Sequence, residues 1–187
     1  FSLDALRSTV NAANEYVKAR KHSLELINPG SSVLPYPNIV SASAAMAAVC
    51  EKIEVAFTSD TPILIRGEPG TGKTVLARTI HAYGNRKDQT FLKVNCAKIK
   101  PDETIGKLFA SADGGSLFFA DIQTLPLPLQ EELLSILQTG CCKSGDGAPL
   151  APMTARVLAT SSEPLEDLAA AGAFNKELLQ ILEAGTV

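Results

Sequence analysis

Residues 61–74 read TPILIRGEPGTGKT, a short apolar run followed by a glycine-rich turn. The apolar run at 62–66 predicts a buried parallel strand. The eight residues after it match the pattern G-x-x-x-x-G-K-[ST] in full, and a helix is predicted from Gly72 to about Tyr83. A strand before the turn and a helix after it form the context that a P-loop requires. We therefore predict that this segment binds a nucleoside triphosphate.

Each residue type in this turn suits phosphate binding. Glycines let backbone N–H groups surround the phosphates, and the helix N-terminus adds the positive end of its dipole. Lys73 is expected to reach the β and γ phosphates, and the Thr74 hydroxyl is expected to ligate Mg²⁺. The predicted nucleotide-binding residues here are Gly67, Glu68, Pro69, Gly70, Thr71, Gly72, Lys73 and Thr74.

Strand-like and helix-like segments alternate along the chain around this turn. Further strands are predicted at 91–95, 116–120 and 155–160, and further helices at 43–57, 126–137, 165–171 and 175–182. This alternation predicts an α/β fold, a three-layer sandwich with a central parallel sheet. Apolar residues at helical spacing predict another helix over residues 1–28, with a linker after it. We expect a linker helix at 1–30 and a nucleotide-binding domain at 31–187.

The composition narrows the functional classes. Of 187 residues, 45% are hydrophobic and 20% charged, which is ordinary for a globular protein. The net charge of −3 offers no basic surface, so DNA binding would require a separate C-terminal domain. No apolar run approaches the ~20 residues that span a bilayer. We expect no membrane contact and a cytoplasmic location, as a fragment of a longer protein.

The four cysteines lack a C-x-x-C pair, which argues against a zinc site or a disulfide framework. Cys141 and Cys142 are adjacent, and we predict that they are free thiols in a loop.

Hydrolysis of a bound nucleotide needs acids beyond the P-loop. The strand at 116–120 leads into Asp121, one acid where two adjacent acids are expected. Asp121 is predicted to hold Mg²⁺ or to orient the attacking water, and both roles stay open. Asn95, at the end of the strand 91–95, is either a hydrogen-bond partner for an acid that senses the γ-phosphate or a strand-end turn residue.

Taken together, these segments resemble the AAA+ domain of bacterial enhancer-binding proteins, the activators of sigma-54 RNA polymerase, over about residues 38–187. Residues 39–46 (IVSASAAM) are similar to the opening segment that contacts adenine, which adds Ile39 and Val40 to the predicted nucleotide contacts. The P-loop resembles the Walker A motif of this family, 91–96 (FLKVNC) its next strand, and 114–130 (GGSLFFADIQTLPLPLQ) its Walker B segment.

The resemblance implies an AAA+ P-loop NTPase fold that binds ATP or ADP with Mg²⁺, whose helical lid would follow Val187. It also implies self-association as a dimer or ring, and RNA polymerase or a paralogous activator as partner. The start of the chain, FSLDALR, resembles the last helix of a response-regulator receiver domain, and a generic amphipathic helix is the alternative.

The chain departs from the family in its catalytic and partner-binding elements. The Asp-Glu pair of Walker B falls on Ala120 and Asp121, and the asparagine of sensor I falls on Ser162. The two arginine fingers fall on Asn175 and Ile181, neither of which is cationic.

A further departure concerns sigma-54. The family grips sigma-54 with a loop of sequence GAFTGA, whereas residues 107–113 here run almost directly into the Walker B strand. The resemblance with these departures implies a module of a transcriptional regulator that binds nucleotide but is impaired in hydrolysis and in engaging sigma-54. Two alternatives stay open: an active ATPase that remodels sigma-54 RNA polymerase, and a protein-interaction scaffold with a vestigial P-loop.

Overall fold

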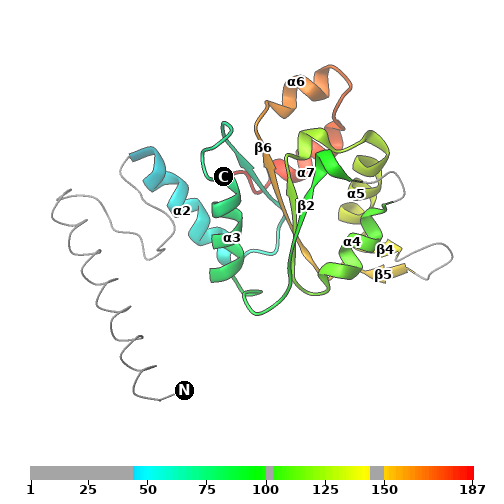
Figure 1. Ribbon diagram of the computed structural model, residues 1–187, viewed down its shortest axis with the longest axis horizontal. Coiled ribbons are helices and arrows are strands. Elements are labelled where there is room, and N and C mark those ends of the chain that lie inside the picture. The colour runs from blue at the N-terminus through cyan, green and yellow to red at the C-terminus, as the bar shows by residue number, and fades with distance from the viewer. Residues whose placement is uncertain (1–43, 100–102, 144–149) are drawn as a thin grey trace, which may run out of the picture. The chain divides into compact units, whose positions relative to one another are not determined.

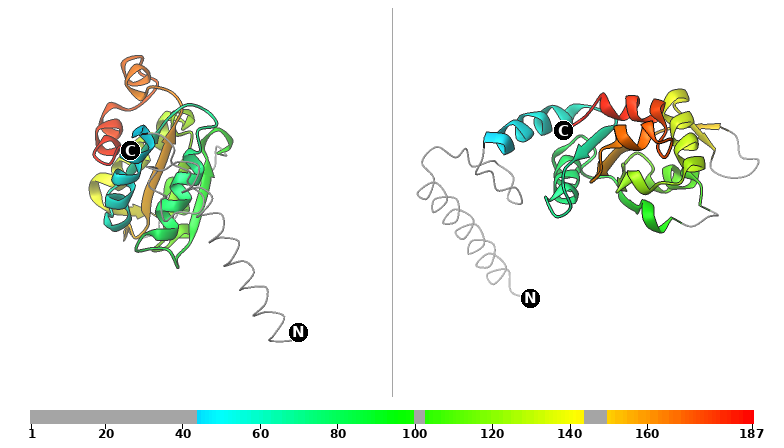
Figure 2. Two further views of the ribbon diagram at one scale, coloured as in Figure 1. Left: turned by 90° about the vertical axis from the view of Figure 1, so that its left-hand side faces the viewer. Right: turned by 90° about the horizontal axis from the view of Figure 1, so that it is seen from above.

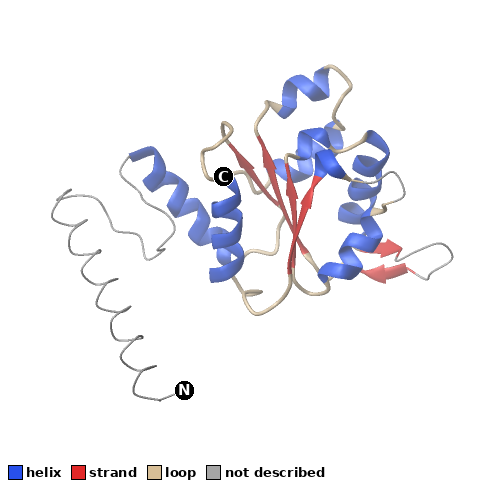
Figure 3. Cartoon of the chain, viewed as in Figure 1, coloured by secondary structure: helices blue, strands red, loops and turns tan. Residues whose placement is uncertain are grey.

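A four-stranded parallel sheet forms the centre of the domain (Figure 1, Figure 3). The computed structural model describes residues 44–99, 103–143 and 150–187. The strands are β1 (Ile63–Arg66), β2 (Phe91–Asn95), β3 (Ser116–Ala120) and β6 (Arg156–Ser161), in the order β1-β6-β3-β2. All three pairings are parallel, which confirms the predicted α/β fold.

The chain divides into two compact units, residues 1–51 and 52–187. Of the first unit the structure describes residues 44–51, so the predicted linker helix at 1–30 lies outside the described residues. The predicted domain boundary near residue 30 stays a prediction. None of the helices in the described ranges is long and apolar enough to cross a membrane.

Helices cover both faces of the sheet (Figure 2). The helices of the described residues are α2 (Ala44–Thr58), α3 (Lys73–Tyr83), α4 (Ile105–Ala112), α5 (Leu127–Thr139), α6 (Leu165–Ala170) and α7 (Lys176–Glu183), with short 3₁₀ turns η1 (Cys96–Lys98) and η2 (Ile122–Thr124). Of these, α3 packs on one face of the sheet, and α4, α5 and α7 pack on the other. Successive strand residues point to opposite faces. Leu117 and Phe119 of β3 join the core formed with α4, α5 and α7, whereas Phe118 faces the side on which α3 packs. The predicted three layers are therefore present.

The C-terminal residues continue the sheet beyond β1. The N–H of Leu64 donates to the carbonyl of Gly185 at 3.3 Å, and the N–H of Val187 donates to the carbonyl of Leu64 at 2.9 Å. A parallel bridge joins Leu64 to Thr186. The strand that leads into the P-loop is thus bonded on both sides.

Cys141 and Cys142 do not lie in a loop, which corrects the prediction. They belong to β4 (Cys141–Lys143), which pairs antiparallel with β5 (Leu150–Pro152). Gly140, at φ 66°, ends α5, and its carbonyl accepts the N–H of Met153 at 2.7 Å. The partner strand comes after residues 144–149, so the local pattern around the cysteines could not show the pairing.

Helix α4 was also not predicted. Its buried residues Ile105, Leu108, Phe109 and Ala112 follow helical spacing, and the Thr104 side chain accepts a hydrogen bond from the N–H of Lys107. The helix has only 8 residues, so its periodicity spans little more than two turns.

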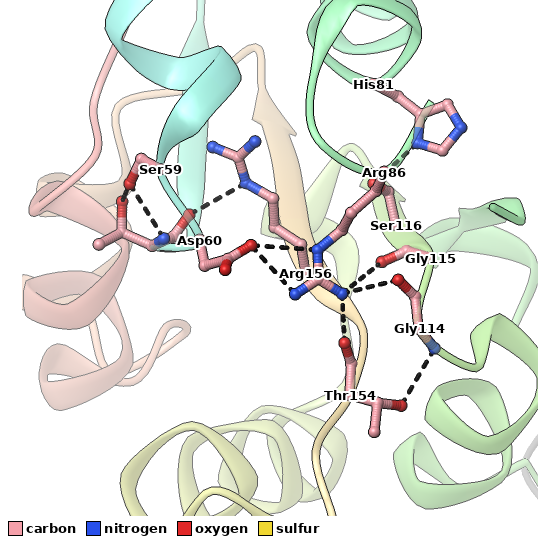
Figure 4. A network of polar contacts seen from close by, with 10 residues as sticks. Ser59, Asp60, His81, Arg86, Gly114, Gly115, Ser116, Thr154 and Arg156 are labelled. Atoms are coloured by element: carbon pink, nitrogen blue, oxygen red, sulfur yellow. Dashed lines mark hydrogen bonds and ion pairs between the residues drawn. The ribbon is translucent and has the colours of Figure 1, made fainter. Parts of the chain in front are cut away.

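Arg86 connects three loops at the amino-terminal end of the strands (Figure 4). Its Nε and Nη2 lie 3.1 and 3.0 Å from Oδ1 of Asp60. Its Nη1 donates to the carbonyls of Gly114 at 2.7 Å and Gly115 at 3.3 Å, and to that of Thr154. One guanidinium therefore ties the loops before β1, β3 and β6 together.

Replacing Arg86 by methionine is expected to destabilise the fold by about 2–3 kcal/mol, because three carbonyls lose a charged donor. The melting temperature should fall by roughly 5–10 °C in a thermal melt followed by circular dichroism. Lys87→Met, which changes an exposed neighbour, is the matched control. An equal effect of both substitutions would contradict the connecting role of Arg86.

His81 gives the fold a pH dependence between weakly acidic and neutral conditions. Its Nδ1 lies 2.9 Å from Oγ of Ser116, and its ring packs 5.1 Å from that of Phe91. Burial lowers the pKa of His81 below its ordinary value of 6.5, against a smaller opposing effect of a backbone hydrogen bond with Gln89. The folded state therefore favours the neutral ring, and this stability is complete above 6.5 and lost as the pH falls through the lowered pKa.

We expect the melting temperature to decrease between about pH 7.5 and about pH 5, and to decrease less in His81→Gln. His22→Gln removes the only other histidine and shows how much of the change belongs to His81. Identical pH profiles of the wild type and His81→Gln would refute this role.

Candidate nucleotide-binding site

The glycine-rich turn lies between β1 and α3, at the carboxyl end of the sheet. Gly70 and Gly72 have φ of 83° and 90°, in the left-handed region that glycine adopts without strain. Gly72 is also the N-cap residue of α3. The predicted P-loop is thus a turn whose backbone requires these glycines and which leads directly into a helix N-terminus.

The Lys73 ammonium lies against the backbone of this turn. Its Nζ donates to the carbonyls of Gly67 at 2.7 Å and Glu68 at 2.8 Å, and the Thr71 hydroxyl donates to the same Glu68 carbonyl at 2.8 Å. Phosphate oxygens would compete with these two carbonyls for the ammonium group. The structure thus brings residues 67–74 together, whereas Ile39 and Val40 lie outside the described residues, so their adenine contact stays a prediction.

Asp121 follows β3 directly and has an unusual backbone. Its φ of 56° makes it the only non-glycine residue with positive φ in the described ranges, and its N–H donates to Oγ1 of Thr160 on β6 at 3.1 Å. Burial, and then the charge of Asp121, raise the pKa of Cys96 to about 12. Because Asn95 pairs with Ala120, Asp121 lies beside the end of β2, and the Cys96 thiol stays protonated at neutral pH.

Asn95 ends β2 and caps the following turn. Its Oδ1 accepts the N–H of Ala97 at 3.1 Å, at the start of η1. This contact is the strand-end role that the sequence left open. A role in sensing the γ-phosphate stays a prediction.

Three side chains that stand where the family has catalytic groups make structural contacts instead. Ser162 Oγ accepts a hydrogen bond from Nε2 of Gln123 at 2.8 Å. The side chain of Asn175 accepts the N–H groups of Glu177 at 2.9 Å and Leu178 at 3.1 Å, which caps α7. Ile181 is partly buried against the hydrophobic core.

Sequence reasoning missed Gln130, which holds the start of α7. Gln130 is buried, its Nε2 donates to the carbonyl of Leu125 at 2.7 Å, and its Oε1 accepts the N–H of Asn175 at 2.8 Å. The sequence did hint at this role, because Gln130 is a polar residue on an otherwise apolar helix face.

Sequence reasoning also missed Arg66, the last residue of β1. Its Nη1 donates to Oε1 of Glu166 on α6, and its Nη2 donates to Oε1 of Glu183 on α7 at 2.9 Å. Partial burial lowers the pKa of Arg66, but the hydrogen bonds and charges of the two glutamates raise it above its ordinary value. The hydrogen bond from Arg66 in turn lowers the pKa of Glu166. A charged residue at the end of an apolar strand was the only hint of this contact.

A P-loop between a strand of a parallel sheet and a covering helix defines the class of P-loop NTPases. The chain has the AAA+ form of this fold, which it shares with its solved structural neighbours. The profile of the Sigma-54 interaction domain matches residues 39–110 and 102–187. The chain belongs to the sigma-54 interaction domain family of bacterial transcriptional regulators.

Similar proteins agree with this assignment. The chain is 34% identical to the luminescence regulatory protein LuxO of Vibrio campbellii over 94% of its own length and 42% of that protein. It is 33% identical to the DNA-binding transcriptional activator HyfR of Escherichia coli over 75% of its length and 24% of that protein. The chain thus spans less than half of these relatives.

Among solved structures, NtrX from Brucella abortus in complex with ATP matches 97% of this chain and 44% of that one, with a TM-score of 0.69 and 26% identity. NtrX in complex with ADP matches with a TM-score of 0.70 at the same identity. These likenesses agree with the fold described above.

Proposed function

We propose that this chain is the nucleotide-binding AAA+ module of a bacterial transcriptional regulator similar to NtrC-type response regulators. It binds ATP or ADP but is impaired in hydrolysis and does not engage sigma-54. The observation that carries the binding is the complete P-loop, with left-handed Gly70 and Gly72 and with Lys73 Nζ within 2.8 Å of the Gly67 and Glu68 carbonyls. The ATP and ADP complexes of NtrX support the choice of ligand.

Mg²⁺ would be held by the Thr74 hydroxyl, the Asp121 carboxylate and the phosphates. Strands β1 and β3 both neighbour β6, so their carboxyl ends lie at the same edge of the sheet. Thr74 follows β1 through the P-loop, and Asp121 follows β3 directly. Hydroxyl and carboxylate oxygens are the hard donors that Mg²⁺ prefers, so the residues fit the ion. Bound there, the ion would neutralise phosphate charge.

Impaired hydrolysis rests on the side chains that stand where transition-state groups are expected. Ala120 is buried and cannot ligate a metal ion, and Asn175 caps α7. Ile181 packs on the core and carries no charge. Interactions made only with the ground state give binding without rate acceleration. Such a module would act by stabilising one conformation or one oligomer when nucleotide binds.

The place where the family match is interrupted supports the absence of a sigma-54 loop. The interruption lies just before and within α4, whereas residues 113–115, which join α4 to β3, lie inside the second matched piece. The family profile matches in two pieces that overlap at residues 102–110, as expected where a stretch of the family has no counterpart. Partners would then be another copy of the chain, a paralogous activator, or RNA polymerase through other contacts.

Titration with a fluorescent ATP analogue, with and without Mg²⁺, tests the proposal. Saturable binding that strengthens with Mg²⁺ is expected, and unlabelled ADP should displace the analogue. A scaffold with a vestigial P-loop predicts no saturable signal in either buffer.

A further inference from the structure

Arg66 joins the P-loop strand to two helices that come much later in the chain. Its two terminal nitrogens bind carboxylates on separate helices, Glu166 of α6 and Glu183 of α7. The Arg66 side chain is 29% exposed, and the Glu166 and Glu183 side chains are 50% and 41% exposed. The contact is therefore partly screened, and its role concerns geometry more than overall stability.

The positive charge of Arg66 suits its place at the end of α7. Glu183 lies in the last turn of α7, where the negative end of the helix dipole disfavours an acid. The Arg66 guanidinium offsets the charge of the Glu183 carboxylate through Nη2, while its Nη1 binds Glu166. A planar guanidinium can hold two carboxylates in fixed directions, which a lysine ammonium does less well.

On its other side, Arg66 is bonded directly to the first residue of the P-loop. The Gly67 carbonyl accepts Lys73 Nζ at 2.7 Å, and the Gly67 N–H donates to the Ser161 carbonyl at 3.3 Å. The N–H of Arg66 itself donates to the carbonyl of Val187 at 3.3 Å. A phosphate that draws Lys73 away would remove a donor from Gly67, one residue from the arginine that holds α6 and α7.

We propose that Arg66 is a positioning residue that couples occupancy of the P-loop to the placement of α6 and α7. The inference rests on the proposed nucleotide binding and adds the route by which a bound phosphate affects these two helices. Lys73 either binds the Gly67 and Glu68 carbonyls or binds phosphate, and Arg66 passes the change in the loop to Glu166 and Glu183. Without the Arg66 guanidinium, the P-loop would still bind nucleotide, but α6 and α7 would respond little to it.

Amide hydrogen exchange on the whole chain, with and without saturating Mg·ADP, measures this coupling. In the wild type, nucleotide is expected to slow exchange in residues 165–183 by about fivefold, the lower end of ordinary coupling between sites. Arg66→Met should lose most of that slowing and keep its ADP affinity within about threefold, because part-exposed ion pairs contribute little. Arg66→Lys should show an intermediate slowing, since lysine keeps the charge but lacks the planar guanidinium with its two terminal nitrogens.

A double substitution and a control complete the test. Adding Glu183→Gln to Arg66→Met should cause no further loss of the nucleotide effect, because both changes remove the same contact. Arg78→Met, which removes an arginine on α3 that lies 5.4 Å over the Phe91 ring, should leave the effect intact.

Saturable ADP binding with the same slowing in Arg66→Met as in the wild type would overturn the inference alone. Absence of saturable binding to the wild type would overturn the proposed function, and the inference with it.

Discussion

Lys73→Ala is expected to weaken binding of ATP and ADP about 100-fold, the largest loss of affinity from a single substitution in this chain. The ammonium lies at 2.7 and 2.8 Å from two carbonyls of the P-loop, at the place where phosphate oxygens would take over as acceptors. Alanine removes that charge while the glycine turn and the α3 N-terminus remain. The residual affinity would come from the backbone N–H groups and the helix dipole.

Calorimetric titration with Mg·ADP and Mg·ATP measures this loss. A thermal melt gives a second readout, because saturating nucleotide should raise the melting temperature of the wild type but not that of Lys73→Ala. Lys87→Ala, at an exposed lysine after α3, is the matched control and should bind as the wild type does. Equal affinity of the wild type and Lys73→Ala would mean that the P-loop does not hold the phosphates.

ATP turnover by the wild-type chain is expected to be indistinguishable from that of Lys73→Ala. An arginine finger alone contributes about 10³–10⁵ in turnover, and the positions expected to supply one carry Asn175 and Ile181. The Asn175 side chain is already bound to two N–H groups at the start of α7, and Ile181 packs on the core. A neighbouring copy of this chain would therefore present no cation from these positions.

Phosphate release, followed over a series of protein concentrations, tests this expectation, because arginines supplied between subunits act only in an oligomer. The release rate should stay at the Lys73→Ala background at every concentration. A rate that rises above this background with protein concentration would instead favour the active ATPase that remodels sigma-54 RNA polymerase.

Reintroducing the missing catalytic side chains is expected to destabilise the fold. Asn175→Arg removes the cap of α7, worth about 1 kcal/mol, as well as changing the charge. Ala120→Asp would place a carboxylate at a position only 6% exposed, at the end of a fully buried strand. Simple reversal of these positions would therefore not separate catalytic from structural effects, which makes the concentration series the sharper test.

Local patterns in the sequence predicted the four parallel strands, the P-loop and most of the helices, but not the order β1-β6-β3-β2 of the strands. The apolar run at 62–66, the glycines at 67, 70 and 72, and Lys73 act over a few residues, so neighbouring residues contain the necessary information. The strands 91–95 and 116–120 were predicted with the observed bounds for the same reason. Asp121 was likewise found as an acid after a buried strand.

Only the tertiary structure decided which polar side chains meet. Arg66 binds Glu166 and Glu183, 100 and 117 residues away, and Arg86 meets the Thr154 carbonyl 68 residues away. The pairing of β4 with β5, and the hydrogen bond from the N–H of Asn175 to Oε1 of Gln130, likewise required the folded chain. Backbone propensity and apolar periodicity are properties of neighbouring residues, whereas a hydrogen bond between distant side chains depends on how the strands and helices pack together.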